Sequence, residues 1–173
     1  MDGKTLLNRY KLLEEIHKTD LNQIYKAVDL TQTDKFVLIN LFHEKIKHRP
    51  LENLLRFKKQ MELLSTIQHE HLLKIYAYYE TEENSMLIME YFEAKPLSLF
   101  LNKNFSIDES IDLILQIASC LNTCHQQGFL HQTLQPDNIL FNEDKKSIKL
   151  FNFGLHLLID LSGITKEKEI IST

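Results

Sequence analysis

The sequence predicts an α+β fold, in which a five-stranded antiparallel sheet with one helix precedes a mostly helical part. Apolar and polar residues alternate through the first forty positions, which is the period of half-buried strands. After residue 50, and again after residue 107, apolar residues recur at the spacing of amphipathic helices. These two periods, in this order, indicate the fold class.

The first ninety residues contain five expected strands. Three of them, Tyr10–His17, Gln23–Leu30 and Lys35–Phe42, are joined by the polar segments KTDLN and TQTD. Two more, Leu73–Glu80 and Ser85–Tyr91, are joined by TEEN. Between these groups Pro50 begins a helix, at a position where proline is tolerated. The apolar stripe predicted for this helix consists of Leu51, Leu54, Leu55, Met61, Leu64 and Ile67.

The second part begins with a short helix, predicted over Leu97–Lys103 after Pro96. Ser106 and Glu109 form the pattern S-x-x-E of a capping box for a longer helix that ends at Gly128. We expect this helix to be substantially buried, because its apolar face is wide. Strands at Ile139–Asn142 and Ser147–Phe151 are expected to form a hairpin around EDKK. The apolar helix face consists of Ile111, Ile114, Leu115, Ala118, Leu121 and Cys124.

Composition excludes several classes of protein. The chain has 173 residues and a net charge of -4, which argues against a nucleic-acid surface. No apolar run approaches the ~18–20 residues of a membrane helix, and MDGKTLLNRYK lacks a signal-peptide core. We therefore expect a cytoplasmic protein. Cys120 and Cys124 are expected to be reduced core residues, His69-Glu70-His71 a loop rather than a zinc site, and the basic cluster 45–49 a solvated loop.

Glycine is scarce, and its positions restrict the chemistry. The chain has only Gly3, Gly128, Gly154 and Gly163, and none lies between residues 4 and 127. A glycine loop that cradles phosphate is therefore excluded from the first two thirds of the sequence.

The most informative stretch is HQTLQPDNIL, at positions 131–140, which Asn152-Phe153-Gly154 follows. The pattern resembles the motifs H-R-D-L-K-P-x-N and D-F-G of the Ser/Thr protein kinase family. From about residue 9 to 160 the chain is similar to this family, with a bacterial character in RFKKQMELLSTIQHEHLLKIY. The resemblance implies a protein kinase-like fold, with a small lobe at 1–92 and an incomplete large lobe at 93–173 that lacks the A-P-E motif and later helices.

The resemblance also places the family's charged residues, and each is replaced. Thr133 stands at the position of the catalytic aspartate, and Gln135 at that of the following lysine. Asn138 and Asn152 occupy the metal-ligand positions, where we expect weak metal binding or none. The glycine-rich loop maps onto residues 17–24 without a glycine, and Asp20 there would repel phosphate. Asn40 replaces the phosphate-binding lysine and Gln60 its glutamate partner, so the domain resembles a degenerate, pseudokinase-type kinase.

The nucleotide pocket implied by the resemblance is degenerate as well. Leu38 stands where the family usually has alanine against adenine, and Phe151 is bulky. Either they fill part of the nucleotide volume or they are ordinary core residues; the sequence leaves both readings open. The family's four stacked spine positions hold suitable residues, namely Leu64, Ile75, His131 and Phe153. The other positions implied for the pocket are Ile16, Ile24, Asn40, Met89 as gatekeeper, Glu90 and Phe92 in the hinge, and Leu140.

Three functions are compatible with these residues. The first is a catalytically impaired kinase-like domain that acts as a binding, scaffold or allosteric module. The second is a divergent Ser/Thr kinase with residual ATP binding and phosphoryl transfer, and the third is a non-functional remnant. We expect no cofactor, and ATP with Mg²⁺ only under the second. We expect another protein or a second copy to cover the incomplete large lobe, and neither nucleic acid nor membrane as a partner.

Overall fold

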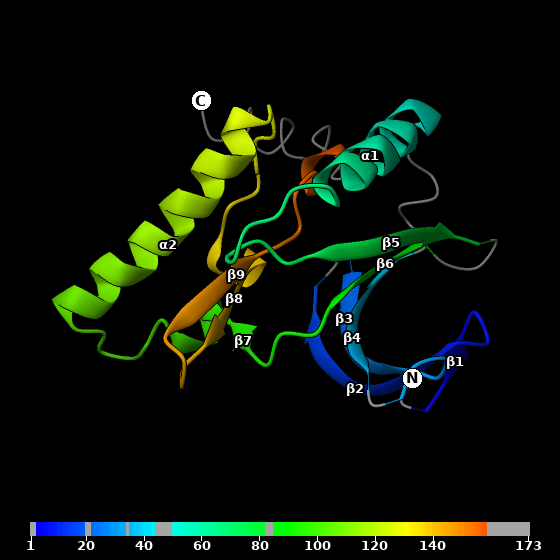
Figure 1. Ribbon diagram of the computed structural model, residues 1–173, viewed down its shortest axis with the longest axis horizontal. Helices are drawn as coiled ribbons and strands as arrows, with labels where there is room; N and C mark the ends of the chain where they lie inside the picture. The colour runs from blue at the N-terminus through cyan, green and yellow to red at the C-terminus, as the bar shows by residue number, and fades with distance from the viewer. Residues whose placement is uncertain (1–2, 20–21, 34, 44–49, 82–84, 159–173) are drawn as a thin grey trace, which may run out of the picture.

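The computed structural model describes residues 3–19, 22–33, 35–43, 50–81 and 85–158. A curled sheet with helix α1 (Leu51–Leu64) forms one part, and a small sheet with helix α2 (Ile107–Gln126) forms the other (Figure 1). The predicted α+β class and the order of its main elements are confirmed. The expected basic loop at 45–49 lies outside the described residues.

The large sheet is antiparallel throughout, with the strand order β1-β2-β3-β4-β6-β5. It contains one strand more than predicted, the edge strand β1. Leu7 and Asn8, at φ of 53° and 52°, form the turn that returns the chain into β2. Leucine rarely adopts this conformation, so Asn8 is the one usual turn residue there. The strands are β1 (Thr5–Leu6), β2 (Tyr10–Lys18), β3 (Asn22–Asp29), β4 (Phe36–Phe42), β5 (Ile75–Glu80) and β6 (Ser85–Glu90).

Alternation along the strands buries both faces of this curled sheet. Ile24, Leu38 and Met89 belong to the core cluster on the side of α1. Tyr25, Ile39 and Ile88, one position away on the same strands, belong to a second cluster on the other face. Successive residues of each strand therefore point into two different cores, one on each face of the sheet.

Helix α1 begins directly after Pro50, as predicted, but its buried stripe differs from the prediction. Leu51 and Leu55 are 70% and 58% exposed. Phe57, which the prediction omitted, is fully buried, and its ring meets Phe42 edge-on at 5.5 Å between centroids. Met61 and Leu64 complete the buried side, so the helix is rotated relative to the predicted stripe.

The second part carries a three-stranded sheet, ordered β7-β8-β9, beside α2. The capping box is confirmed, because the Glu109 N–H donates to Ser106 Oγ at 3.2 Å and the Ser106 N–H donates to Glu109 Oε2 at 2.9 Å. The predicted short helix is a single 3₁₀ turn, η2. These elements are β7 (Lys95–Pro96), η2 (Leu97–Phe100), η3 (Pro136–Asn138), β8 (Ile139–Asn142), β9 (Ser147–Leu150) and η4 (Leu155–Leu157).

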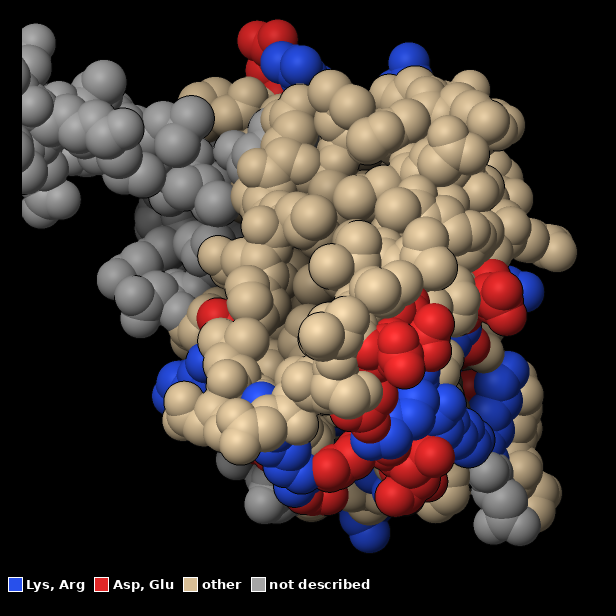
Figure 2. Space-filling view, turned by 90° about the vertical axis from the view of Figure 1, so that its left-hand side faces the viewer, with Lys and Arg blue, Asp and Glu red and all other residues tan. Residues whose placement is uncertain are grey.

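The expectation that α2 is substantially buried is wrong. Its buried residues are Leu113, Cys120 and Cys124, whereas Ile114 and Leu115 are 63% and 60% exposed. Figure 2 looks onto the side where α2 lies in Figure 1, and much of this side carries no charged side chain. Both cysteines are free and buried, as predicted. No helix in the described part of the chain is long and apolar enough to span a membrane.

Candidate functional site

His131 and Phe153 form the packed base of the candidate site. Their rings stack with centroids 4.3 Å apart, and His131 Nε2 donates to the carbonyl of Phe151 at 2.9 Å. Burial lowers the pKa of His131 below its ordinary value. This histidine is therefore neutral near pH 7 and acts in packing, as the sequence indicates.

A series of buried asparagines crosses from the large sheet to the loop around η3. Asn22 Nδ2 donates to Asn40 Oδ1 at 2.7 Å, and Asn40 Nδ2 donates to Asn152 Oδ1 at 2.8 Å. Asn152 Nδ2 donates to Asn138 Oδ1 at 2.9 Å, and Asn138 Nδ2 donates to the carbonyl of Thr133 at 2.6 Å. We call Asn22, Asn40, Asn152 and Asn138 the amide chain. All four are at most 8% exposed, so these bonds form away from water.

The amide chain occupies the positions at which the motifs predict phosphate and metal ligands. The Oδ1 atoms of Asn138 and Asn152 both accept N–H donors from within the chain. A hard dication prefers anionic oxygens, and an N–H group pointing at the same oxygen opposes a cation there. In the described residues no group of three His, Cys, Asp or Glu side chains is placed to hold a metal. These residues do not fit Mg²⁺.

Thr133 and Gln135 are not assembled into a catalytic group. Thr133 Oγ1 makes long contacts, of 3.4 Å to the carbonyls of His131 and Asn152 and 3.5 Å to His131 Nδ1. A hydroxyl of this kind cannot accept a substrate proton near neutral pH. Gln135 is exposed and contributes its backbone carbonyl, which accepts the N–H of Asn138 at 2.9 Å.

Gln60 stands apart from the amide chain. The Asn40 amide bonds to Asn22 and Asn152 rather than to Gln60. Instead the Oε1 atom of Gln60 lies beside Gly154, only 2.5 Å from where a Cβ on that glycine would be. The two replacements therefore do not recreate a small-lobe pair.

The segment aligned with the glycine-rich loop also makes its own contacts. Thr19 Oγ1 donates to Asn22 Oδ1 at 2.5 Å, which extends the amide chain by one hydroxyl. His17 Nε2 lies 3.9 Å from Asp137 Oδ1, across from β2 to η3. Sequence reasoning treated Asn22 only as a lost glycine and did not identify Asp137. The predicted effect of Asp20 lies outside the described residues.

The walls of the predicted base pocket are packed against one another. Leu38 and Phe151 are buried, at 1% and 3% exposure, as expected whether they fill part of the nucleotide volume or are ordinary core residues. A cavity of only about 10 Å³ remains behind Met89, and Leu64, Ile75 and Phe153 also line it. An adenine ring binds against accessible side-chain surface. The walls of this pocket offer almost none, because each is at most 2% exposed: Ile24, Leu38, Met89 and Leu140.

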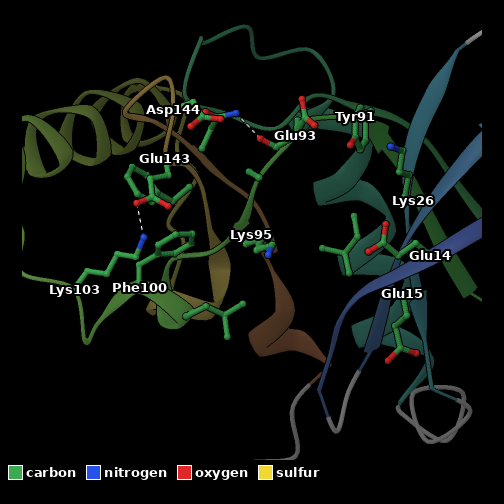
Figure 3. Close-up of a pocket in the computed structure, with 15 residues that line it drawn as sticks. Glu14, Glu15, Lys26, Tyr91, Glu93, Lys95, Phe100, Lys103, Glu143 and Asp144 are labelled. Atoms are coloured by element: carbon green, nitrogen blue, oxygen red, sulfur yellow. Dashed lines mark hydrogen bonds and ion pairs between the residues drawn. The ribbon is translucent and has the colours of Figure 1, made fainter.

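The rim positions Ile16, Glu90 and Phe92 are only half-buried. Glu90 is held in place from two sides, because Lys149 Nζ and the Lys74 N–H donate to Glu90 Oε1 at 2.7 and 2.8 Å. In front of this rim the chain forms a wide groove of about 780 Å³, which Ile16, Tyr91 and Glu93 help to line (Figure 3). The open space therefore lies in front of the hinge and not in the base pocket.

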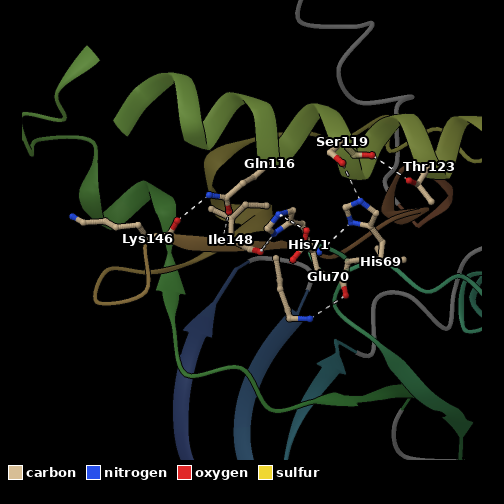
Figure 4. A network of polar contacts seen from close by, with 10 residues as sticks. His69, Glu70, His71, Gln116, Ser119, Thr123, Lys146 and Ile148 are labelled. Atoms are coloured by element: carbon tan, nitrogen blue, oxygen red, sulfur yellow. Dashed lines mark hydrogen bonds and ion pairs between the residues drawn. The ribbon is translucent and has the colours of Figure 1, made fainter. Parts of the chain in front are cut away.

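Behind the site, two histidines join α2 to the hairpin (Figure 4). His69 Nε2 lies 3.1 Å from Ser119 Oγ on α2, and His71 Nδ1 donates to the carbonyl of Ile148 at 3.2 Å. Gln116 binds the same hairpin through its Oε1 atom, which accepts the Ile148 N–H at 3.0 Å. Burial and the neighbouring His71 lower the pKa of His69. These contacts are structural, in agreement with the predicted loop.

Comparison with known proteins identifies the family. The sequence profile of the protein kinase domain matches residues 10–169. The chain belongs to the protein kinase family. It is 24% identical over 166 residues to the probable serine/threonine-protein kinase PknB of Lactococcus lactis, covering 95% of this chain and 26% of the relative. It is 29% identical over 178 residues to a probable serine/threonine-protein kinase of Clostridium acetobutylicum, covering 100% and 26%.

Solved kinase structures confirm the fold. The kinase domain of Mycobacterium tuberculosis PknI, with two substitutions, superposes with a TM-score of 0.80 at 17% identity, covering 92% of this chain and 62% of that one. The chain spans about a quarter of the length of the two curated relatives. The kinase-like fold and the family are thus established, and the activity of this chain is a separate question.

Proposed function

We propose that this protein kinase family member acts as a binding, scaffold or allosteric module and does not transfer phosphoryl groups. The amide chain is the observation that carries the proposal. In a working kinase, a lysine and a metal-binding aspartate act on the nucleotide phosphates. Here Asn40 and Asn152 hold those positions and satisfy one another at 2.8 Å.

Energetics favour the amide chain over a bound nucleotide. A fully bonded buried amide network is stable, whereas breaking it leaves buried polar groups that each cost about 1–3 kcal/mol. Nucleotide phosphates with Mg²⁺ would have to break several of these bonds, and no ammonium or carboxylate is present in the amide chain to compensate. The packed base pocket adds a second cost, since forcing a ring into a filled core costs about 1–3 kcal/mol.

The two alternative functions, a divergent kinase and a non-functional remnant, make different demands on the structure. A divergent Ser/Thr kinase with residual ATP binding would require the amide chain and Leu38 to move aside. A non-functional remnant would not need a uniquely folded cleft, yet in the described residues only His17 Nε2 is a buried side-chain polar atom without a hydrogen bond. Nearly complete hydrogen bonding of buried polar atoms favours a specific native structure.

A thermal-shift titration with ATP, with and without Mg²⁺, tests the proposal. A ligand at 100 times its Kd stabilises the native state by about 2.7 kcal/mol, so binding would raise the melting temperature clearly. We expect a cooperative melt that millimolar ATP leaves unchanged. A metal-dependent rise, together with phosphate transfer from labelled ATP, would overturn the proposal, and a non-cooperative melt would favour the remnant.

The double variant Asn40→Lys/Asn152→Asp tests whether the amide chain or the packed base pocket prevents nucleotide binding. If this variant gains a Mg²⁺-dependent shift while the natural chain has none, the amide chain is the barrier. If neither responds, the same variant is combined with Leu38→Ala, which enlarges the base pocket.

We also propose that the exposed apolar face of α2 contacts another protein or a second copy of the chain. Ile111, Ile114 and Leu115 are 49%, 63% and 60% exposed on this face. Exposed apolar surface of this kind commonly marks an interaction site.

A further inference from the structure

A wide groove lies in front of the segment that links β6 to η2 (Figure 3). Its volume is about 780 Å³, and its walls come from β2, the linker 91–95, η2 and the turn after β8. This is within the range of protein ligand sites, about 300–1,000 Å³. The amide chain does not line it, so a ligand in the groove leaves the amide chain intact.

Three carboxylates on the groove have no partner. Glu14 comes from β2, Glu93 from the linker and Asp144 from the hairpin turn, and all three are exposed. In the described part of the chain, none of these carboxylates takes part in an ion pair or a hydrogen bond. The backbone of Glu93 is fixed, however, because Asn142 Nδ2 donates to its carbonyl at 2.5 Å.

Two of the three lysines on the groove are already engaged. Lys26 Nζ lies over the rings of Tyr91 and Phe36, at 4.5 and 4.6 Å from their centroids. Lys103 pairs with Glu143 and lies 5.2 Å from the Phe100 ring centroid. In the described residues Lys95 and Lys26 are in no ion pair, so two positive charges face the three carboxylates that lack a partner. The unpaired charge on the groove is therefore net negative.

The lower wall of the groove is aromatic. Phe100 and Phe141 meet edge-on with centroids 5.1 Å apart and are 8% and 1% exposed, so they are rigidly packed. Leu99 beside them is 65% exposed. An apolar side chain of a ligand would gain burial against the exposed surface of Leu99.

We propose that the groove binds an extended basic peptide segment of a partner protein, with arginine or lysine side chains on both sides of an apolar one. The inference rests on the proposed binding function and names the partner's chemistry. Phosphate ligands are repelled by the unpaired carboxylates. Glu14, Glu93 and Asp144 come from three separate elements around the groove, so an extended chain with several positive side chains can pair with more than one of them.

Fluorescence anisotropy with three labelled nonapeptide pools tests this inference. The pools share a central leucine and differ at two fixed positions on either side of it, which hold arginine, glutamine or glutamate. We expect the arginine pool to bind tightest, the glutamate pool not to bind, and the preference to weaken between 50 and 300 mM NaCl because exposed charges are screened. Equal affinity for the arginine and glutamine pools would overturn the inference.

Matched charge reversals place the binding in the groove. Exposed ion pairs each contribute modestly to affinity, so Glu93→Lys/Asp144→Lys together should weaken binding of the arginine pool roughly tenfold. The control Glu62→Lys/Glu80→Lys makes the same change in net charge at exposed sites outside the groove and should leave affinity nearly unchanged. An equal loss in both variants would show general charge attraction and overturn the proposed site.

A third variant, Leu99→Ser, tests the apolar contact without changing charge. It should lower the affinity for the arginine pool at both salt concentrations. Melting curves of every variant confirm that it is folded. The ATP titration and the peptide titration have separate readouts. A Mg²⁺-dependent ATP response with phosphate transfer therefore overturns the proposed function, whereas loss of the arginine preference overturns only the proposed groove site.

Discussion

Asn40 and Asn152 lie 112 positions apart in the chain, yet Asn40 Nδ2 donates to Asn152 Oδ1 at 2.8 Å. The bond joins β4 of the large sheet to the segment that follows β9. Both residues are nearly inaccessible, at 0% and 8% exposure. Neutral amides thus connect the two parts of the domain, at the positions where the family motif has opposite charges.

Removing the centre of the amide chain should therefore be costly. Asn40→Ala leaves Asn22 Nδ2 and Asn152 Oδ1 buried without these partners. Because each unsatisfied buried group costs about 1–3 kcal/mol, we expect the free energy of unfolding to fall by about 2–5 kcal/mol. Urea unfolding followed by circular dichroism measures the change.

Asn122→Ala is the control, because Asn122 is exposed on α2. It should leave stability unchanged or raise it by a few tenths of a kcal/mol, since alanine is the better helix former. A loss of less than 0.5 kcal/mol in Asn40→Ala, within the range of ordinary surface substitutions (about 0.5 kcal/mol), would mean that the amide chain does not stabilise the native state.

Local patterns predicted much of this fold and less of its site. The period of two located five strands, and Ser106 with Glu109 located the start of α2, because each signal depends on neighbouring residues. The amide chain depends on pairs such as Asn22 and Asn40, which only the folded sheet brings together. Asn22 was visible in the sequence as a replaced glycine, but its partner was not. The β1 turn at Leu7 and Asn8 was missed because only Asn8 is a usual turn residue, whereas Leu7 also adopts positive φ and leucine rarely does.

Burial of His131 predicts a dependence of stability on pH. The folded state holds the pKa of His131 below its ordinary value of 6.5, so the unfolded chain binds more protons near that pH. The stabilisation is present above about pH 6.5 and is lost as the pH falls below it. In His131→Phe the aromatic stack on Phe153 remains and the titration is removed.

We therefore expect the natural chain to lose more stability between pH 7 and pH 5.5 than His131→Phe does. Urea midpoints across this range measure both slopes, and His69, whose pKa is also lowered, contributes equally to both proteins. His125→Gln, at an exposed position, should retain the natural slope. Identical slopes in all three proteins would contradict a titrating His131.

The exposed face of α2 predicts association. Sedimentation velocity at increasing concentration should show that the chain self-associates or, with a partner present, forms a complex. Ile114→Asp/Leu115→Asp places charge on the face without disturbing the core, since both residues are mostly exposed. This variant should lose the association, and Leu30→Asp, at a position 56% exposed elsewhere, should not. Association that survives the double substitution would assign it to a different surface.

Gly154 lies directly after Phe153, at φ of 75°, where a Cβ would be 2.5 Å from Gln60 Oε1 and 3.3 Å from Met61 Cε. Left-handed backbone costs a non-glycine residue about 1–2 kcal/mol, whereas a flexible glutamine end can move at small cost. We expect Gly154→Ala to lower the free energy of unfolding by about 1–2 kcal/mol, and Gln60→Ala to rescue only a small part of that loss. Gly128→Ala separates the two causes, because Gly128 has φ of 80° and nothing within 4 Å of an added Cβ. Similar losses at both glycines would assign the cost to the backbone; a much larger loss at Gly154, recovered in the double variant with Gln60→Ala, would instead show that α1 is packed tightly against the Phe153–Gly154 segment.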